Sequence, residues 1–495
     1  MNPLVLVVVA YPLILLGVSV WRSKGLKDHD DFTVAGRSVP VYLLVGTLVC
    51  TWIGSGSLFG GAGLAYRTGI SELWFSFGAW VGLVVAYFLA GRVRRIADYT
   101  VPDLLERRYN ATARMLGTLA IVLAYVTIAA YQFRGGGWIL SIVTDGKIDP
   151  TMGMLITAVA IILFTALAGM VSIVSVDIFN GIAIVVGIVF ALPYMVLKVG
   201  GVGAVLAALP PEHTTVLGGH NGLWVIGIGM PTFLLLLGES GMYQKFFSAK
   251  DENAAKKAVV GMVLGVIFIE TTLALLAIVG RAAYPDLMNE ESILGRAASE
   301  TIILYIARFG LPMAGGVVLL AAAIAIVLST GNTFLLVPST SASRDIYQRF
   351  FDPNASPARM LLVQRGLIVA FGGIGLLLLT QFQSVLTMAL YAYSLVGASL
   401  TPALLAAFLW KRVTPQGGVA CLGGGMATIV GLVVASRIGL QTTLGEMNKF
   451  DFASSDYIVI PATCVSVSLL VIVSLLTPPS PEEKWQPFFA KSDPD

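Results

Sequence analysis

The feature that most limits how this chain can fold is its series of long apolar runs, which only short polar segments separate. A helix needs about 20 apolar residues to cross the hydrocarbon core of a bilayer. Barrel strands would instead alternate apolar and polar residues over about ten positions. The 495-residue chain is therefore predicted to be an all-α polytopic membrane protein, and its 12% of charged residues argues against a water-soluble enzyme.

Counting the runs by length predicts about thirteen transmembrane helices. The predicted spans are 3–21, 40–66, 70–90, 112–142, 151–171, 173–199, 221–245, 256–283, 311–340, 359–382, 384–410, 415–437 and 455–477. The first is interpreted as a retained helix and not as a signal peptide, because no small-residue cleavage site follows it.

Basic residues predict the orientation, since lysine and arginine are retained on the cytoplasmic side. With the N-terminus outside, most of the 31 lysines and arginines fall in inside segments, and the outside segment 200–221 has none. We therefore expect a multi-pass plasma-membrane protein with an external N-terminus and a cytoplasmic C-terminus. No basic block indicates nucleic acid, and no polar segment is long enough for a soluble domain.

Two predicted spans contain residues that interrupt helices. In the second span, glycines and hydroxyl residues gather between Cys50 and Gly61, and in the seventh Gly227 and Pro231 lie close together. Glycines also allow helices to pack closely, which would explain either span alone. Interruptions at corresponding places in two halves indicate instead a secondary transporter with an inverted repeat, whose substrate and ion bind near the membrane midplane.

Four segments, in matching order over most of the chain, resemble the sodium:solute symporter family. They are 61–72, 164–181, 243–250 and 329–347. The resemblance implies a leucine-transporter-type fold with a 5+5 inverted repeat, one helix before it and two after it. The implied units are 1–38 (first helix and cytoplasmic segment), 39–199 (first repeat), 200–412 (second repeat), 413–477 (two C-terminal helices) and 478–495 (cytoplasmic tail).

The resemblance also implies sodium-coupled import of a small polar organic solute by alternating access. It implies a main sodium site where the second span meets the ninth. Carried onto this chain, the ligands are the carbonyls of Cys50, Ile53 and Ile326 and the hydroxyls of Ser329 and Thr330. Carbonyls of an unwound helix can replace the hydration shell of a hard cation. None of these groups titrates near neutral pH, which favours sodium over a proton.

Asp177 has two interpretations. Some members of the family are described with a second sodium ion at the equivalent aspartate, and here Asn332 and Thr333 would complete that site with Ser329. The family often has serines where this chain has Asn332 and Thr333. The alternative is a structural carboxylate that nearby amides hold at the cytoplasmic end of the span.

The solute is expected beside the two interruptions, where unwound backbone offers amides and carbonyls. The residues assigned to solute binding are Thr51, Trp52, Gly54, Gly56, Phe59, Gln132, Gly227 and Pro231. An amino acid, a vitamin or a quaternary amine is preferred. Arg134, inside the fourth span, is expected to neutralise Glu239 or Glu270 or to face a solute carboxylate.

Other classes of function fit the sequence less well. A proton-coupled transporter of the same fold is the first alternative. A sodium-conducting channel should show a continuous polar pore lining, an intramembrane enzyme a nucleophile–base pair or metal ligands, and a sensor an added soluble domain. We expect a monomer that acts in the lipid bilayer on a small-molecule solute, with Na+ as the coupling ion and no nucleic-acid partner.

Overall fold

The computed structural model describes residues 39–96, 100–288, 295–382, 384–438 and 451–489, and six isolated positions before residue 18. Within 168–178, only the backbone and the side chain of Asp177 are described. The predicted first span and the unit 1–38 lie almost entirely outside these residues, as does the end of the tail 478–495. In the described ranges the chain is helical and forms no β-strand.

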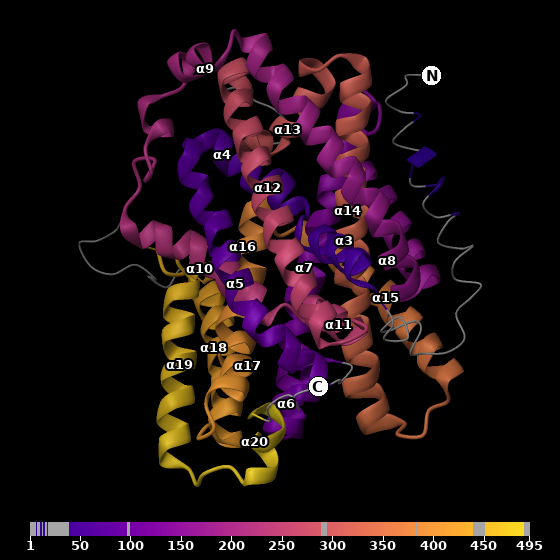
Figure 1. The fold of residues 1–495 in the computed structure, drawn as a ribbon, viewed down its shortest axis with the longest axis vertical. Helices are drawn as coiled ribbons and strands as arrows, with labels where there is room; N and C mark the ends of the chain where they lie inside the picture. Colours follow the sequence, from indigo (N-terminus) through magenta and orange to yellow (C-terminus); the bar gives the residue numbers. More distant parts are fainter. Residues whose placement is uncertain are drawn as a thin grey trace.

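The helices follow one another with short connections (Figure 1). They are α3 (Val41–Trp52), α4 (Ala62–Thr68), α5 (Leu73–Ile96), α6 (Val101–Arg108), α7 (Ala111–Val143), α8 (Pro150–Val199), α9 (Val202–Ala208), α10 (Gly222–Gly238), α11 (Ser240–Ser248), α12 (Glu252–Ala283), α13 (Ile302–Tyr305), α14 (Met313–Ser341), α15 (Pro357–Leu379), α16 (Val385–Leu395), α17 (Thr401–Leu409), α18 (Pro415–Arg437), α19 (Val459–Leu476) and α20 (Glu482–Phe489). Wider π-helical turns join some of them, among them η2 (Gly56–Gly61) and η9 (Val396–Leu400).

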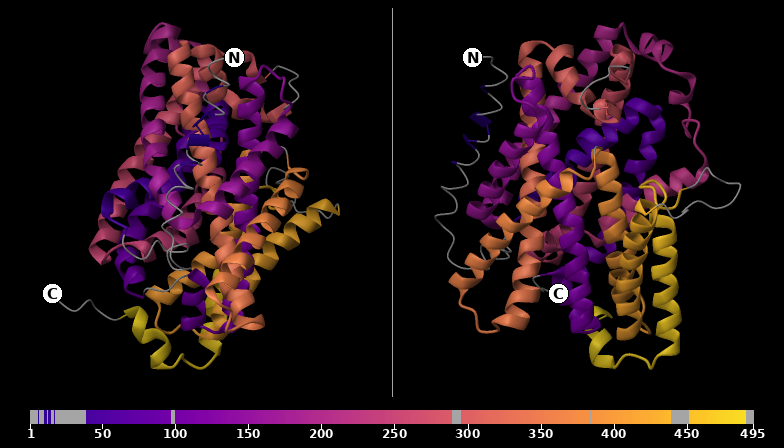
Figure 2. Two further views of the ribbon diagram at one scale, coloured as in Figure 1. Left: turned by 90° about the vertical axis from the view of Figure 1, so that its right-hand side faces the viewer. Right: turned by 180° about the vertical axis from the view of Figure 1, so that it is seen from behind.

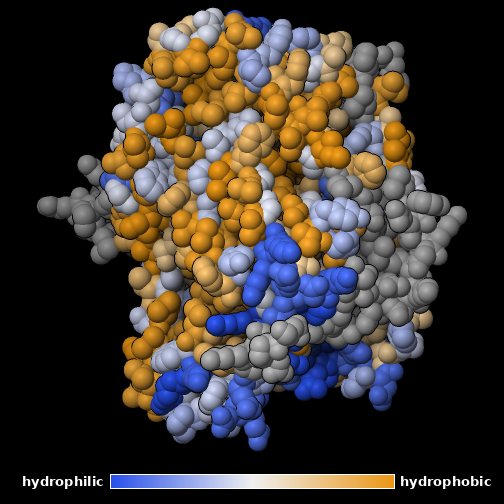
Figure 3. Space-filling model, viewed as in Figure 1, coloured by the Kyte–Doolittle hydropathy of each residue, from blue (hydrophilic) through white to orange (hydrophobic). Residues whose placement is uncertain are grey.

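The outer surface of the helices is apolar. Large side chains such as Phe88 and Leu264 are about two-thirds exposed, at 68% and 67%. Figure 3 shows apolar residues over most of one face, with hydrophilic residues gathered toward its lower part. Such a surface suits lipid and not water. Among the described residues, eleven helical segments are long and apolar enough to cross a membrane, which agrees with the polytopic helical fold expected from the sequence.

Residues 150–199 form two membrane-crossing arms of α8, Pro150–Leu167 and Phe179–Val199. Both arms lie against α14. Ile161 of the first arm lies beside Gly331 of α14, and Gly187 of the second arm lies beside Leu319 of α14. Along α14, Leu319 and Gly331 are about 18 Å apart, whereas Ile161 and Gly187 would be about 39 Å apart if α8 were straight. The chain therefore turns back between the arms, as the two predicted spans 151–171 and 173–199 require.

Two helices are interrupted in the same way. At the first interruption, Ile53 ends α3 with φ −72° and ψ 98°, and at the second Glu239 ends α10 with φ −71° and ψ 103°. A small enclosed cavity separates them, and its walls include Thr51, Leu236 and Glu239. The two interruptions therefore share one backbone conformation and lie next to each other at the centre of the molecule.

The predicted position of the second interruption was wrong. α10 runs without a break from Gly222 to Gly238 and contains both Gly227 and Pro231. Proline lacks one backbone donor, but this helix accommodates that loss. The real interruption is at Glu239, whose carboxylate accepts hydrogen bonds from the amides of Gly241 and Met242 and so begins α11.

The remaining helices surround this centre. Figures 1 and 2 place α19 and α15 on opposite flanks of the molecule, with α7 between them. Short polar side chains fix where several spans begin. Asn110 accepts a hydrogen bond from Ala113 N at the start of α7, and Asp251 accepts one from Ala254 N at the start of α12.

Gly78 holds α5 close to α10, and replacing it tests this packing. A methyl group there would collide with Gly229 O and with Thr232 Oγ1. We expect Gly78→Ala to lower the free energy of unfolding by about 1–3 kcal/mol through overpacking. The measurement is thermal stability in detergent. Gly431→Ala is the control, because nothing lies within 4 Å of its added methyl group, and equal melting temperatures for the two variants would contradict the contact.

Candidate functional site

The first interruption leaves backbone groups free of helical partners. The amide of Ser55 donates to Gln132 Oε1 at 3.0 Å and not to the carbonyl of Thr51 four residues earlier. Gly54 permits the close approach of α14 at this point, because a methyl group there would lie 2.8 Å from Thr330 Cγ2. The carbonyls at the end of α3 therefore face α14 across a short distance.

Two hydroxyls of α14 meet these carbonyls. Thr330 Oγ1 lies 3.2 Å from Cys50 O and 3.1 Å from Ile53 O, and Ser329 Oγ lies 3.4 Å from Cys50 O. The Thr330 hydroxyl thus bonds across to α3, although most intramembrane hydroxyls bond to their own helix. Ile326 lies one turn before Thr330 and is buried. The structure thus brings together the residues expected at the main sodium site. Their carbonyl and hydroxyl oxygens are neutral ligands of the kind that a hard cation prefers.

Asp177 borders this group of oxygens. Its Oδ1 accepts a hydrogen bond from Ser329 Oγ at 2.5 Å, and its Oδ2 accepts one from Thr47 Oγ1 at 2.5 Å. The side chain of Asp177 is 1% exposed. The carboxylate therefore joins α8, just before its second arm, to both α3 and α14.

Asn332 and Thr333 point elsewhere. Asn332 Oδ1 accepts a hydrogen bond from Thr165 Oγ1 at 3.1 Å, in the first arm of α8. Thr333 Cγ2 faces α11, 3.3 Å from where a methyl group on Gly241 would lie. Its hydroxyl is buried and has no hydrogen-bond partner in the described part of the chain. Of the three residues suggested to complete a second sodium site, the structure brings only Ser329 to Asp177.

Lys245 is a neighbour of this site that sequence reasoning missed. Its side chain is fully buried, its Nζ donates to Thr47 O at 2.9 Å and to Thr51 Oγ1, and Nζ lies 4.0 Å from Asp177 Oδ2. The positive-inside pattern counts basic residues by segment and gives no signal for a buried lysine.

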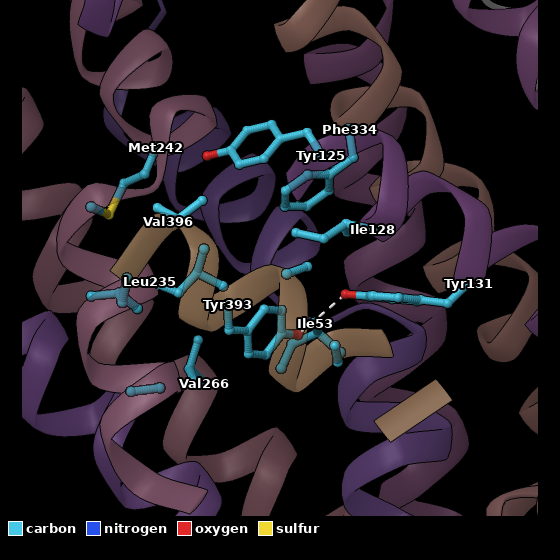
Figure 4. Close-up of a cluster of buried hydrophobic side chains, with 14 of the residues drawn as sticks. Ile53, Tyr125, Ile128, Tyr131, Leu235, Met242, Val266, Phe334, Tyr393 and Val396 are labelled. Atoms are coloured by element: carbon cyan, nitrogen blue, oxygen red, sulfur yellow. Dashed lines mark hydrogen bonds between the residues drawn. The ribbon is translucent and has the colours of Figure 1, made fainter. Parts of the chain in front are cut away.

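The residues assigned to the solute divide into two groups. Thr51, Trp52, Gly54, Gly56, Phe59 and Gln132 lie around the first interruption. Gly56 faces the hydroxyl of Tyr393, which lies 3.2 Å from that of Tyr131, and Phe59 packs edge-on against Trp138 (Figure 4 shows the two tyrosines). Nε2 of Gln132 is buried without a partner in the residues described. Sequence reasoning did not find Tyr131 or Tyr393.

Gly227 does not join this group, and Pro231 lies within α10, eight residues before the interruption at Glu239. Leu236 shares the central cavity with Thr51, and Gly227 is about 14 Å farther along α10. A methyl group on Gly227 would collide with the carbonyl of Asp456, in the segment before α19. Gly227 therefore allows α10 to pack closely against the segment before α19. This agrees with the alternative that glycines in a span serve close packing.

A buried carboxylate faces the first interruption from α12. Glu270 accepts hydrogen bonds from Trp52 Nε1 at 2.9 Å, Trp80 Nε1 at 2.8 Å and Ser57 Oγ at 3.3 Å. Its side chain is 4% exposed, whereas Trp52 and Ser57 are half-buried. Within the described ranges Glu270 has no basic partner. A negative group at the edge of the interruption is thus held by neutral donors alone.

The role expected for Arg134 as a partner of Glu239 or Glu270 was wrong. Arg134 donates to the carbonyls of Leu379 and Phe382, at 2.8 Å and 2.5 Å. Leu379 is the last residue of α15, where carbonyls without helical partners attract a cation. Glu239 instead accepts from Tyr125 and from the first amides of α11.

Comparisons with known proteins agree with these features. The model of the sodium:solute symporter family matches residues 32–425. The sodium/proline symporter of Escherichia coli is 24% identical, with 90% of this chain and 95% of that protein covered. The osmoregulated proline transporter OpuE of Bacillus subtilis is 23% identical, with 94% and 93% covered.

Solved structures share the fold. A substrate-bound, outward-open Na+-coupled sialic acid symporter aligns with a TM-score of 0.78 at 16% identity, over 97% of this chain and 99% of that one. MhsT in complex with L-phenylalanine aligns with a TM-score of 0.57 at 14% identity, over 88% and 97%. The expected leucine-transporter-type fold is confirmed.

Proposed function

Since this chain belongs to the sodium:solute symporter family, we propose that the oxygens between α3 and α14 bind the sodium ion that drives its transport. The protein is a sodium-coupled symporter in a membrane and not an enzyme. The proposed ligands are the carbonyls of Cys50, Ile53 and Ile326 and the hydroxyls of Ser329 and Thr330.

The observation that carries this proposal is the position of the Thr330 hydroxyl, 3.2 Å and 3.1 Å from the carbonyls of Cys50 and Ile53. The carbonyls belong to an interrupted helix and the hydroxyl belongs to α14, so an ion between them joins two separate elements. An ion that prefers one arrangement of these elements shifts the population toward it. Sodium binding thereby biases which side of the membrane the solute site faces.

The driving force follows from the membrane potential. One sodium ion that enters down a potential of 100 mV supplies about 2.3 kcal/mol. This corresponds to roughly fifty-fold accumulation of a neutral solute before the sodium concentration gradient is added. A single ion per cycle is therefore sufficient for strong uptake.

We propose the orientation with an external N-terminus and a cytoplasmic C-terminus. The arginines at the end of α5 and along α6 support it, because basic residues are retained on the cytoplasmic side. Basic Lys411, which follows α17, lies 4.6 Å from the ring of Trp485 in α20, near the C-terminus. The inverted repeats proposed are 39–199 and 200–412, each with one interrupted helix. We further propose that the monomer is the working unit.

We propose that the solute binds beside Thr51–Ser57 and carries an ammonium or quaternary amine group. Glu270 supports this choice, because its carboxylate lies next to Trp52 and Ser57 and has only neutral donors. A buried charge without an opposite charge is costly, and a cationic solute group would supply that charge. The two relatives named for proline transport carry an amino acid of this class.

The sodium site is tested by Thr330→Val, which removes the hydroxyl and keeps the shape. We expect the sodium concentration for half-maximal uptake to rise by about tenfold or more, because an unmade polar contact costs about 1–3 kcal/mol. Thr428→Val is the control, since that hydroxyl bonds to Gly424 O of its own helix. Unchanged sodium dependence of Thr330→Val would contradict the site, and undiminished uptake from a proton gradient without sodium would favour proton coupling.

The solute class is tested by Glu270→Gln. We expect amino acids or quaternary amines to lose about tenfold or more in affinity, because a hydrogen bond to a charged group contributes about 1.5–3 kcal/mol. Binding is measured against a panel of amino acids, quaternary amines, vitamins, monocarboxylates and sugars. Sodium-induced thermal stabilisation without solute should persist in the variant. Transport of an uncharged sugar with equal affinity by both proteins would show that Glu270 has another role.

A further inference from the structure

Lys245 is a fully buried lysine in the middle of a membrane protein. Lys245 is 0% exposed, and its neighbour Asp177 is 1% exposed. Ionisable residues inside a membrane are costly unless they are partnered, and those that persist usually take part in function. Of the described lysines, Lys245 alone is buried to this extent, so its surroundings need an explanation.

The contacts of Lys245 link both interrupted helices. Lys245 belongs to α11, which follows the second interruption, and its Nζ donates to Thr47 O and Thr51 Oγ1 of α3, which precedes the first. Glu239, six residues before Lys245, begins α11. Lys245 thus ties α11, which follows the second interruption, to α3, which precedes the first.

The same ammonium group faces the carboxylate of Asp177. Nζ lies 4.0 Å from Oδ2, while Oδ1 accepts from Ser329, which also reaches Cys50 O. A continuous series of polar groups therefore runs from Lys245 through Asp177 and Ser329 to the proposed sodium ligands. Asp177 lies between a fixed cation on one side and the ion site on the other.

We propose that Lys245 supplies the positive charge beside Asp177 in place of a second sodium ion, so that the chain binds one sodium ion per transport cycle. This inference rests on the proposed main sodium site. A second ion at Asp177 would be a third positive charge there, beside Lys245 and the ion of the main site, in a region of low dielectric where like charges repel strongly. Asn332 and Thr333, which would complete the coordination of that ion, also point away from the carboxylate.

Equilibrium binding of radioactive sodium to the purified full chain, without solute, tests the proposal. We expect one sodium ion per wild-type chain. Lys245→Met removes the fixed charge and keeps the chain length, so a second ion should bind, and this second ion should be lost again in Lys245→Met/Asp177→Asn. Lys198→Met is the matched control, because that lysine bonds to Gly310 O at the other end of α8, and it should bind one ion with wild-type affinity.

Asp177→Asn gives an independent measurement. If Lys245 is the counter-charge of Asp177, the variant leaves an unpaired ammonium group near the main site, and sodium affinity should fall at least tenfold while one ion still binds. If Asp177 is a sodium ligand, the variant should bind one ion where the wild type binds two.

Two results would overturn the proposal: two ions bound by the wild type, or Lys245→Met with unchanged stoichiometry and affinity. If Lys245→Met does not fold, Lys245→Arg and the double variant with Asp177→Asn decide, since the first should bind one ion and the second should restore folding with one ion bound. Failure of the main site itself is distinguishable, because sodium binding would then be unaffected by Thr330→Val.

Discussion

Backbone carbonyls inside a membrane need partners, and the centre of this molecule depends on how those at the end of α3 find them. Water is absent from the hydrocarbon core, so an interrupted helix persists only where protein groups or ions satisfy its free carbonyls. Here Thr330 and Ser329 reach the carbonyls of Cys50 and Ile53 from α14. Because the same carbonyls are the proposed ion ligands, the requirement that makes the interruption possible also suits it to bind a cation.

The sequence predicted the polytopic helical fold, because hydrophobic length is a local property that the bilayer imposes directly. It also located the first interruption, where glycines and hydroxyls gather around Gly54. It misplaced the second, because a proline inside a membrane helix need not break it, whereas the real interruption depends on a carboxylate that begins the next helix. Capping by Glu239 has no strong sequence signal inside an apolar run.

Buried charges were the least predictable part. Lys245 and Arg134 were both judged by general rules, one for basic residues in cytoplasmic segments and one for ion pairs within spans. Their real partners come from distant parts of the chain: Asp177 and Thr47 for Lys245, and the last carbonyls of α15 for Arg134. Side-chain pairs of this kind depend on tertiary packing, so one sequence without its structure does not specify them.

The matching backbone angles at Ile53 and Glu239 have a consequence for the transport cycle. If two repeats of inverted direction bend at equivalent joints, the outward-open and inward-open forms differ mainly by which repeat adopts which shape. A perfectly symmetric pair would have the two forms at equal energy and would favour neither side of the membrane. Directional preference must then come from side chains present in one repeat only, and Thr330 and Lys245 both belong to the proposed second repeat.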